Sequence, residues 1–407
     1  MILNVKNIGK IKEAEIDISS ITLICGTNST GKSTIAKSLF SIFNGLSNTS
    51  TQIAKERKYD FDYMMDILKV VGDVSDENIE NIKKSIAISD SKEKSIKNIL
   101  DKYIDRDSLK DLILERFVAS ISVDDDDILT EIINRRLNAE FDNQINNIYN
   151  DEEGTIQLTI NDKSSNTNKI SKFIIKDNKV KKIENNIDLK SEAIYIDDFK
   201  LIENIVADEY GPMSKRRPSV NHTGHLENII KETSENHVIR NIINNNYFKK
   251  ILNEICPGDI YISKESNKYE YRPVGTDKSL SVRNVAEGLK NFIMMKLLIS
   301  KETLLNNGVL ILDEPEIHLH PEWQLKFAEL IVIINKYLST HILINTHSPY
   351  FLNAIEVYSK KYDVENTKYY LSEIDGSIED VSNEIYKVYD KLASPLQILE
   401  SEEYSGD

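Results

Sequence analysis

The chain has 407 residues, with 51 Lys and Arg against 66 Asp and Glu, and a formal net charge of −15. Its 40% hydrophobic and 29% charged residues are ordinary for a soluble globular protein. The length exceeds what one hydrophobic core usually fills, so we expect two or more lobes. The charge argues against a surface that is positive all over, although local basic patches for nucleic acid stay open.

Several absences in the sequence narrow the class of protein. No apolar run approaches about 18 residues, so no membrane span is expected. The strand-like N-terminus lacks the plan of a signal peptide. Cys25 and Cys256 lie far apart and form no C-x-x-C pair, which argues against a zinc site. We therefore expect a cytoplasmic protein whose cysteines are small buried hydrophobic residues.

The first 45 residues contain a phosphate-binding pattern. Alternating apolar residues over 1–20 predict an antiparallel hairpin, and Ile21–Cys25 is a short apolar run typical of a buried strand. The next eight residues, 26–33, read G-x-x-x-x-G-K-S, and 34–43 has one apolar helical face. Strand, glycine-rich turn and helix place backbone N–H groups against phosphate oxygens, whereas the alternative is a surface loop rich in Gly and Ser. The residues expected to bind nucleotide are Gly26, Asn28, Ser29, Thr30, Gly31, Lys32, Ser33 and Thr34.

The spacing of apolar residues changes twice in the middle of the chain. Over residues 49–153 apolar residues recur at helical spacing between polar breaks, and no heptad run is long enough for an extended coiled coil. We expect a compact helical insertion or helical arms of modest length. Strand alternation returns at Gly154 and predicts a small antiparallel β lobe over 154–190.

From residue 191 onward strands and helices alternate. Ala193–Ile196 predicts a buried strand that ends in two aspartates, and 211–225 is irregular and contains the basic cluster Lys215-Arg216-Arg217. Residues 226–255 have a helical pattern, and 260–271 again predicts strands. A late hairpin is expected over 369–381, and 401–407 should be a solvated acidic tail.

Two further apolar strands carry polar residues where they end. Val309–Leu312 is followed by Asp313-Glu314, and a long amphipathic helix over 323–338 leads to His341–Ile344, which is followed by Asn345-Thr346-His347. Strands that alternate with helices imply a parallel sheet with ligands at the carboxyl ends of the strands.

These residues supply what phosphoryl transfer from ATP needs. Lys32 would neutralise the β- and γ-phosphates, and the Ser33 hydroxyl would bind Mg²⁺. Asp313 is the candidate Walker B ligand of the same ion, the alternative being a helix cap. Glu314 is the candidate general base, since successive side chains diverge at a strand end. His347 could contact the γ-phosphate or the attacking water, although a lone histidine at a strand end is more often structural.

Together the motifs resemble the ABC-type ATPase heads of the RecF, SMC and OLD (overcoming-lysogenisation-defect) group. The resemblance covers residues 1–45 and about 190–400, and the form D-E-P-E-x-H-L-H-P at 313–321 is similar to OLD-like bacterial ATPases, as is Asn28. It implies an α/β ABC-type P-loop head, made of a RecA-like mixed sheet and an antiparallel β lobe, with a helical insertion. On this basis we assign 1–48 and 191–400 to the head.

The resemblance also implies a shared active site. Two heads would sandwich two ATP molecules in a homodimer or a higher oligomer, and each nucleotide would meet the signature motif of the opposite subunit. The signature candidate is 284–290, N-V-A-E-G-L-K, in which Ala286 stands where the family has serine. A serine hydroxyl would donate to the γ-phosphate across the interface, and alanine cannot, so slow hydrolysis is expected. The Gly288 amide and the helix dipole remain as anion-binding features. Alternatively Ala286 only packs a helix start, and Asn284 or Lys290 makes the contact.

The Q-loop of this family senses Mg²⁺ and the γ-phosphate. Asp197 or Asp198 stands at the corresponding strand end, and we place Asp197 among the candidate metal ligands. The alternative is that both acids belong to a solvated turn.

Three uses of the ATPase compete. An OLD-like ATPase of the Septu or PARIS kind would control a separate effector, often a nuclease, in antiphage defence; the residues after His347 are too few for a Toprim nuclease. A RecF- or SMC-like repair ATPase would bind DNA through Lys215–Arg217 or the lysines of 179–182. A scaffold that binds ATP without turnover could sequester a toxin. A transporter ATPase is disfavoured by the missing signature serine and the long interval before it.

Overall fold

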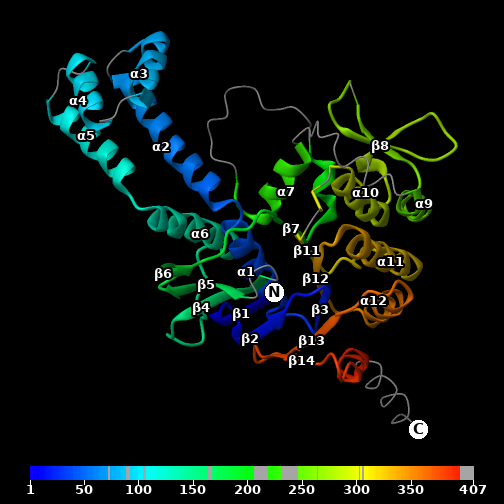
Figure 1. Ribbon diagram of the computed structural model, residues 1–407. Helices are drawn as coiled ribbons and strands as arrows, with labels where there is room; N and C mark the ends of the chain where they lie inside the picture. The colour runs from blue at the N-terminus through cyan, green and yellow to red at the C-terminus, as the bar shows by residue number, and fades with distance from the viewer. Residues whose placement is uncertain are drawn as a thin grey trace, which may run out of the picture. The chain divides into compact units, whose positions relative to one another are not determined.

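The computed structural model divides into two compact units, Met1–Ser47 with Ile133–Asp407, and Asn48–Ile132 (Figure 1). The residues it describes are 1–71, 74–88, 92–103, 107–162, 167–205, 219–231, 246–263, 265–301, 303–304 and 307–394. The basic cluster at 215–217 and the acidic tail at 401–407 lie outside these residues. None of the helices in the described ranges is both long and apolar enough to cross a membrane.

The centre of the larger unit is a mostly parallel sheet. Its strands are nearly all apolar and buried, because helices cover both faces. The order within the described residues is β14-β13-β3-β12-β11-β7, and β14 alone runs antiparallel. The bounds are β3 Ile21–Cys25, β7 Ala193–Ile196, β11 Val309–Asp313, β12 His341–Thr346, β13 Lys368–Ser372 and β14 Ile378–Asp380.

Register brings the polar strand ends together. Asp313 pairs with Asn345 across β11 and β12, and Thr346 pairs with Cys25 across β12 and β3. The carboxyl ends of these three strands therefore meet at one edge of the sheet, where the 26–33 loop begins. This confirms the expected α/β fold and the position of the motifs on it.

Helices pack on this sheet from two sides. Leu310, Leu312 and Ile344 belong to the core shared with α10 to α12, whereas Tyr195 contacts Phe40 of α1. Edge-to-face aromatic contacts among Phe292, Trp323 and Phe327 fix α10 against α11. The helices are α1 Lys32–Gly45, α7 His222–Lys231, α9 Asn246–Ile255, α10 Glu287–Ser300, α11 Pro321–Leu338 and α12 Pro349–Lys361, with 3₁₀ helices η1 Phe199–Glu203 and η2 Val282–Asn284.

The antiparallel lobe is larger than the sequence indicates. β4 pairs with β1, with Leu158 opposite Leu3 and Ile156 opposite Val5, so the N-terminal hairpin and residues 154–190 form one sheet. An isolated two-stranded hairpin is at best marginally stable, whereas the joined strands share one apolar face large enough to pack. The sheet contains β1 Ile2–Ile8, β2 Ile11–Asp17, β4 Gly154–Asp162, β5 Thr167–Lys176 and β6 Lys179–Asn185, and a small third sheet contains β8 Asp259–Ile262, β9 Tyr269–Arg272 and β10 Leu280–Ser281.

The smaller unit is helical, with its own core around Met64, Leu68 and Ile96. This compact unit ends at Ile132, and the second half of α6 belongs to the larger unit. There Ile133 and Leu137 are fully buried, and a Cβ on Gly45 would lie 2.0 Å from Ile133 Cδ1. The helices are α2 Thr49–Val71, α3 Asp76–Ile88, α4 Lys92–Tyr103, α5 Asp107–Ser122 and α6 Asp125–Phe141.

Candidate functional site

The 26–33 loop connects β3 to α1 and contains two glycines, Gly26 and Gly31. Any other residue at either position would force neighbouring atoms to move. Gly31 has φ 98°, in the left-handed region, and a Cβ there would lie 2.4 Å from Ile11 Cδ1. A Cβ on Gly26 would lie 2.5 Å from the Ser372 carbonyl oxygen. The loop backbone is thus pressed between the hairpin and β13, which gives it a fixed concave shape.

Lys32 lies inside this loop. Its ammonium donates to the carbonyl oxygens of Gly26 at 3.0 Å and Thr27 at 2.8 Å, and its side chain is buried. Burial lowers its pKa, and the carboxylates of Glu314 and Asp313 act in the opposite direction. Phosphate oxygens can compete with the two carbonyls for this cation, as the predicted role requires.

Thr30 holds the loop together. Its hydroxyl donates to the Thr27 carbonyl at 2.9 Å and lies 2.7 Å from the Ser372 hydroxyl, which donates to the Cys25 carbonyl at 3.1 Å. Its side chain therefore serves the loop, and its backbone N–H is the group left for a phosphate. Asn28, Ser29 and Ser33 are exposed. Ser372, the last residue of β13, was not predicted, because its role depends on a tertiary contact between β13 and the 26–33 loop.

Asp313 is held at the end of β11 by two neutral donors. Its Oδ2 accepts from the Tyr195 hydroxyl at 2.8 Å, and its Oδ1 accepts from Asn345 Nδ2 at 3.1 Å. Glu314, with φ 50°, turns the chain away from the strand, and its N–H donates to the Asn345 carbonyl at 2.9 Å. Neither Tyr195 nor Asn345 was expected as part of the site.

The structure brings Glu314 and His347 together. His347 Nδ1 lies 3.3 Å from Glu314 Oε1 and 3.9 Å from Glu316 Oε1. Glu316, which the sequence analysis quoted without a role, is buried and accepts hydrogen bonds from the Thr346 hydroxyl at 2.5 Å and the His347 N–H at 3.3 Å. Burial raises its pKa despite these donors. Its signal was a third acid within the D-E-P-E run.

Asp197 has a different partner from the one expected. It follows β7, and its Oδ2 lies 2.9 Å from His222 Nε2. Burial acts against its charge, but the hydrogen bond from His222 lowers its pKa. Asp198 instead caps η1 by accepting from the Lys200 N–H at 2.8 Å. Across the described ranges, three or more His, Cys, Asp or Glu do not gather into a metal-binding group.

The signature candidate, 284–290, spans the start of α10. Ala286 is the N-cap and provides no side-chain hydrogen bond to this described helix start. A Cβ on Gly288 would lie 3.1 Å from Leu319 Cδ2, so glycine allows close packing against the segment after Walker B. Glu287 lies 2.8 Å from Lys200 and 3.4 Å from His318. Lys290, one alternative contact, is buried and pairs with Glu203 at 2.5 Å.

The residues present suit Mg²⁺ and ATP. Asp313 and Ser33 offer the hard oxygen ligands that Mg²⁺ prefers. Asn345 Oδ1, beside Asp313, is a buried acceptor without a partner within the described part of the chain. The loop and the α1 N-terminus, which no described side chain caps, provide the N–H groups for anionic phosphates.

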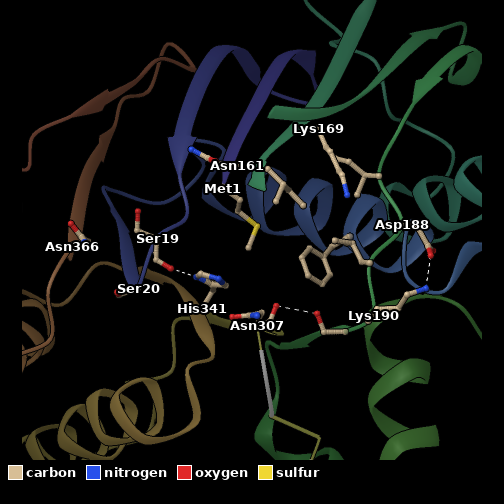
Figure 2. Close-up of a pocket in the computed structure, with 15 residues that line it drawn as sticks. Met1, Ser19, Ser20, Asn161, Lys169, Asp188, Lys190, Asn307, His341 and Asn366 are labelled. Carbon is tan, nitrogen blue, oxygen red and sulfur yellow. Dashed lines mark hydrogen bonds and ion pairs between the residues drawn. The ribbon is translucent and has the colours of Figure 1, made fainter. Parts of the chain in front are cut away.

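Two cavities lie at opposite ends of the strands. One, of about 610 Å³, adjoins the phosphate loop, since the Lys10 ammonium donates to the Ser29 carbonyl at 2.6 Å. The other, of about 860 Å³, lies at the amino ends of the parallel strands (Figure 2). Their linings include Lys10, Lys12, Asn147, Tyr149, Asn150 and Asp375 in the first, and Met1, Ser19, Phe43, Lys169, Asn307 and His341 in the second.

The fold resembles several solved structures at low sequence identity. The SMC head bound to the C-winged helix domain of ScpA has 12% identity, a TM-score of 0.47 and coverage of 95% of this chain and 98% of that one. The SMC head domain from Thermotoga maritima has 11% identity and a TM-score of 0.42, with coverage of 94% of this chain and 97% of that one. A third structure is the Smc head domain with an extended coiled coil bound to the C-terminal domain of ScpA, derived from Pyrococcus furiosus. It has 11% identity and a TM-score of 0.43, with coverage of 98% of this chain and 98% of that one.

No curated protein matches the chain. Residues 1–352 match the family described as the AAA ATPase domain, and this range contains the phosphate loop, Asp313, Glu314 and His347. The chain is an ATP-binding ATPase of P-loop type and belongs to the AAA ATPase domain family.

Proposed function

We propose that the protein binds ATP with Mg²⁺, hydrolyses it slowly and uses a head-to-head dimer to control a partner effector. One observation carries the proposal: Lys32, Asp313 and Glu314 interact electrostatically at one sheet edge, and His347 contacts Glu314 there. A buried cation, a metal-binding carboxylate and a positioned base are the groups that phosphoryl transfer to water requires.

The chain's own residues divide the work. Lys32 binds the β- and γ-phosphates, and Ser33 and Asp313 hold Mg²⁺, which when bound neutralises charge on the phosphate oxygens. Glu314 accepts a proton from the attacking water. His347, 3.3 Å from Glu314, orients that water or contacts the γ-phosphate. Glu316 fixes His347 through its backbone N–H.

The cavity beside the loop is our proposed place for the nucleoside. It opens at Lys10, whose contact with Ser29 joins it to the phosphate loop. Tyr149, 73% exposed, offers a ring on which a base can stack. Tyr149→Ala should weaken binding of a fluorescent ATP analogue several-fold and leave pyrophosphate binding unchanged.

The dimer supplies the second half of the site in this proposal. Gly288 and the N-terminus of α10 would face the γ-phosphate bound by the partner subunit, without the hydroxyl that serine would give. Slow turnover suits a switch, in which the ATP-bound dimer engages a separate effector, a nuclease in cytoplasmic antiphage defence being our first candidate. On β6, Lys181 and Lys182 form exposed ion pairs with Asp177 and Glu184 and Lys179 is exposed, so a DNA-binding ATPase is the alternative to this proposal.

Purified protein tests the core of this proposal. We expect phosphate release that depends on Mg²⁺, and an ATP-dependent dimer of Glu314→Gln in light scattering. Lys32→Ala should show neither. If Glu314→Gln forms the dimer and retains full biological activity, the protein acts as an ATP-dependent scaffold and turnover is dispensable.

A further inference from the structure

The Walker B carboxylate is oriented by a tyrosine from a neighbouring strand. The Tyr195 hydroxyl donates to Asp313 Oδ2 at 2.8 Å, and Asn345 Nδ2 donates to Oδ1 at 3.1 Å. Each carboxylate oxygen therefore has one donor and keeps lone pairs for a cation. Two donors from flanking strands prevent the carboxyl group from rotating about its last bond.

Tyr195 itself cannot move easily. It lies on β7 between the sheet and α1, is 1% exposed, and has Phe40 at a ring distance of 6.2 Å. A phenol is neutral at pH 7, so the buried hydroxyl is a donor to Asp313.

A histidine supports the far side of the ring. His222 lies against Tyr195 with ring centroids 4.3 Å apart and an interplanar angle of 31°. Its two ring nitrogens contact Glu140 at 2.8 Å and Asp197 at 2.9 Å, and its backbone N–H donates to Glu140 at 2.5 Å. Residues of α6, β7 and α7 thus hold this ring from three directions.

We propose that Tyr195 is a positioning residue that sets the orientation of Asp313 for Mg²⁺, and that His222 supports Tyr195 in this task. The inference rests on the proposed nucleotide function. Residues that hydrogen-bond to metal ligands typically change metal affinity by about 10- to 100-fold when they are lost. Asn345 remains as a second donor here, so the expected change is at the lower end of that range.

Tyr195→Phe removes only the hydroxyl and is the direct test. A fluorescent ATP analogue is titrated with Mg²⁺, and the midpoint of the Mg²⁺-dependent rise in affinity is measured. We expect a midpoint about tenfold higher than in the unaltered protein. Affinity for the analogue in EDTA should stay the same, because the phosphate loop is untouched.

Tyr269→Phe is the matched control. Tyr269 is also buried and also loses a hydrogen bond, from its hydroxyl to the Ile230 carbonyl at 2.8 Å, but it lies on β9. Its Mg²⁺ midpoint should not change. An equal shift in both variants, or an unchanged midpoint in Tyr195→Phe, overturns the inference.

His222→Gln provides a second variant with the Tyr195 hydroxyl intact. Loss of the ring contact should raise the Mg²⁺ midpoint about threefold, less than loss of the hydroxyl itself. A larger shift than that of Tyr195→Phe would contradict the proposal that His222 acts on Asp313 through Tyr195. If the unaltered protein fails to bind the analogue under any condition, the proposed function fails as well, and this result is distinct from an unchanged midpoint.

Discussion

The two helix starts that we propose for phosphate binding carry side chains of opposite charge. α1 begins after Gly31, and Lys32 supplies a buried cation within its first turn. α10 begins after Ala286 and carries Glu287, an acid paired with Lys200 and His318, in its first turn. Both N-termini have a positive dipole end. In the proposed site, α1 therefore supplies a cation to the nucleotide, whereas α10 supplies an acid and no side-chain donor at its N-cap.

The largest expected effect concerns the nucleotide half. Glu314→Gln removes the base but keeps its size, so phosphate release should fall about 1,000-fold while ATP affinity changes little. Single-turnover phosphate release and analogue binding measure the two quantities. Glu322→Gln, an exposed acid on α11, is the control. A loss below about tenfold would show that Glu314 is not the base.

Loss of the buried cation should abolish most binding at α1. Lys32→Ala removes charge-assisted hydrogen bonds to phosphate, and the affinity for ATP should fall about 100-fold. Titration with a fluorescent analogue measures it, and Lys37→Ala on the same helix is the control. Equal ATP affinities in Lys32→Ala and Lys37→Ala would show that the buried cation at the start of α1 does not bind phosphate.

Acid should weaken the packing beneath α1. Burial, helped by the charge of Arg136, lowers the pKa of His225 to about 4, and its ring lies 5.6 Å from that of Phe40 on α1. A folded-state pKa below the unfolded value means that the unfolded chain takes up the proton first as the pH falls. The free energy of unfolding should therefore drop by about 2 kcal/mol from pH 7 to pH 5 through this residue. Denaturant titrations of the protein and of His225→Phe check it, since the variant should lose this part of the slope.

Restoring the missing hydroxyl should strengthen the α10 half. Ala286→Ser can add one hydrogen bond to a γ-phosphate held by the partner subunit, which corresponds to up to about tenfold in turnover. Steady-state phosphate release measures the effect, and Ala54→Ser in the helical unit is the control. If turnover and ATP-dependent dimerisation both stay unchanged, the segment 284–290 is not the signature.

The smallest effect should come from the acid at α10. Glu287→Gln removes a negative charge near the phosphates in the proposed dimer, and it releases Lys200 and His318 from their partner. ATP-dependent dimerisation should tighten about threefold, and less so at high salt. Sedimentation at several protein concentrations measures it. Weaker dimerisation would mean that the Glu287 pairs hold the segment in its binding shape.

The sequence by itself determined the parts of the site that depend on local pattern. An apolar run followed by glycines, or by a carboxylate or a histidine, is enough to predict a buried strand with a polar end, and parallel strands bring those ends together. Lys32, Asp313, Glu314 and His347 became site candidates in this way. The expected lobe at 154–190 lacked the pairing with β1, because alternation identifies a strand but not its neighbour.

Only the tertiary structure decided how these residues are held. Thr30 meets Ser372 across 342 positions of sequence, and Tyr195 meets Asp313 across 118. A tyrosine in an apolar strand looks like any other core residue until folding places a carboxylate within reach of its hydroxyl. The physical reason is that a buried polar group needs a partner, and chain topology alone chooses which one it finds.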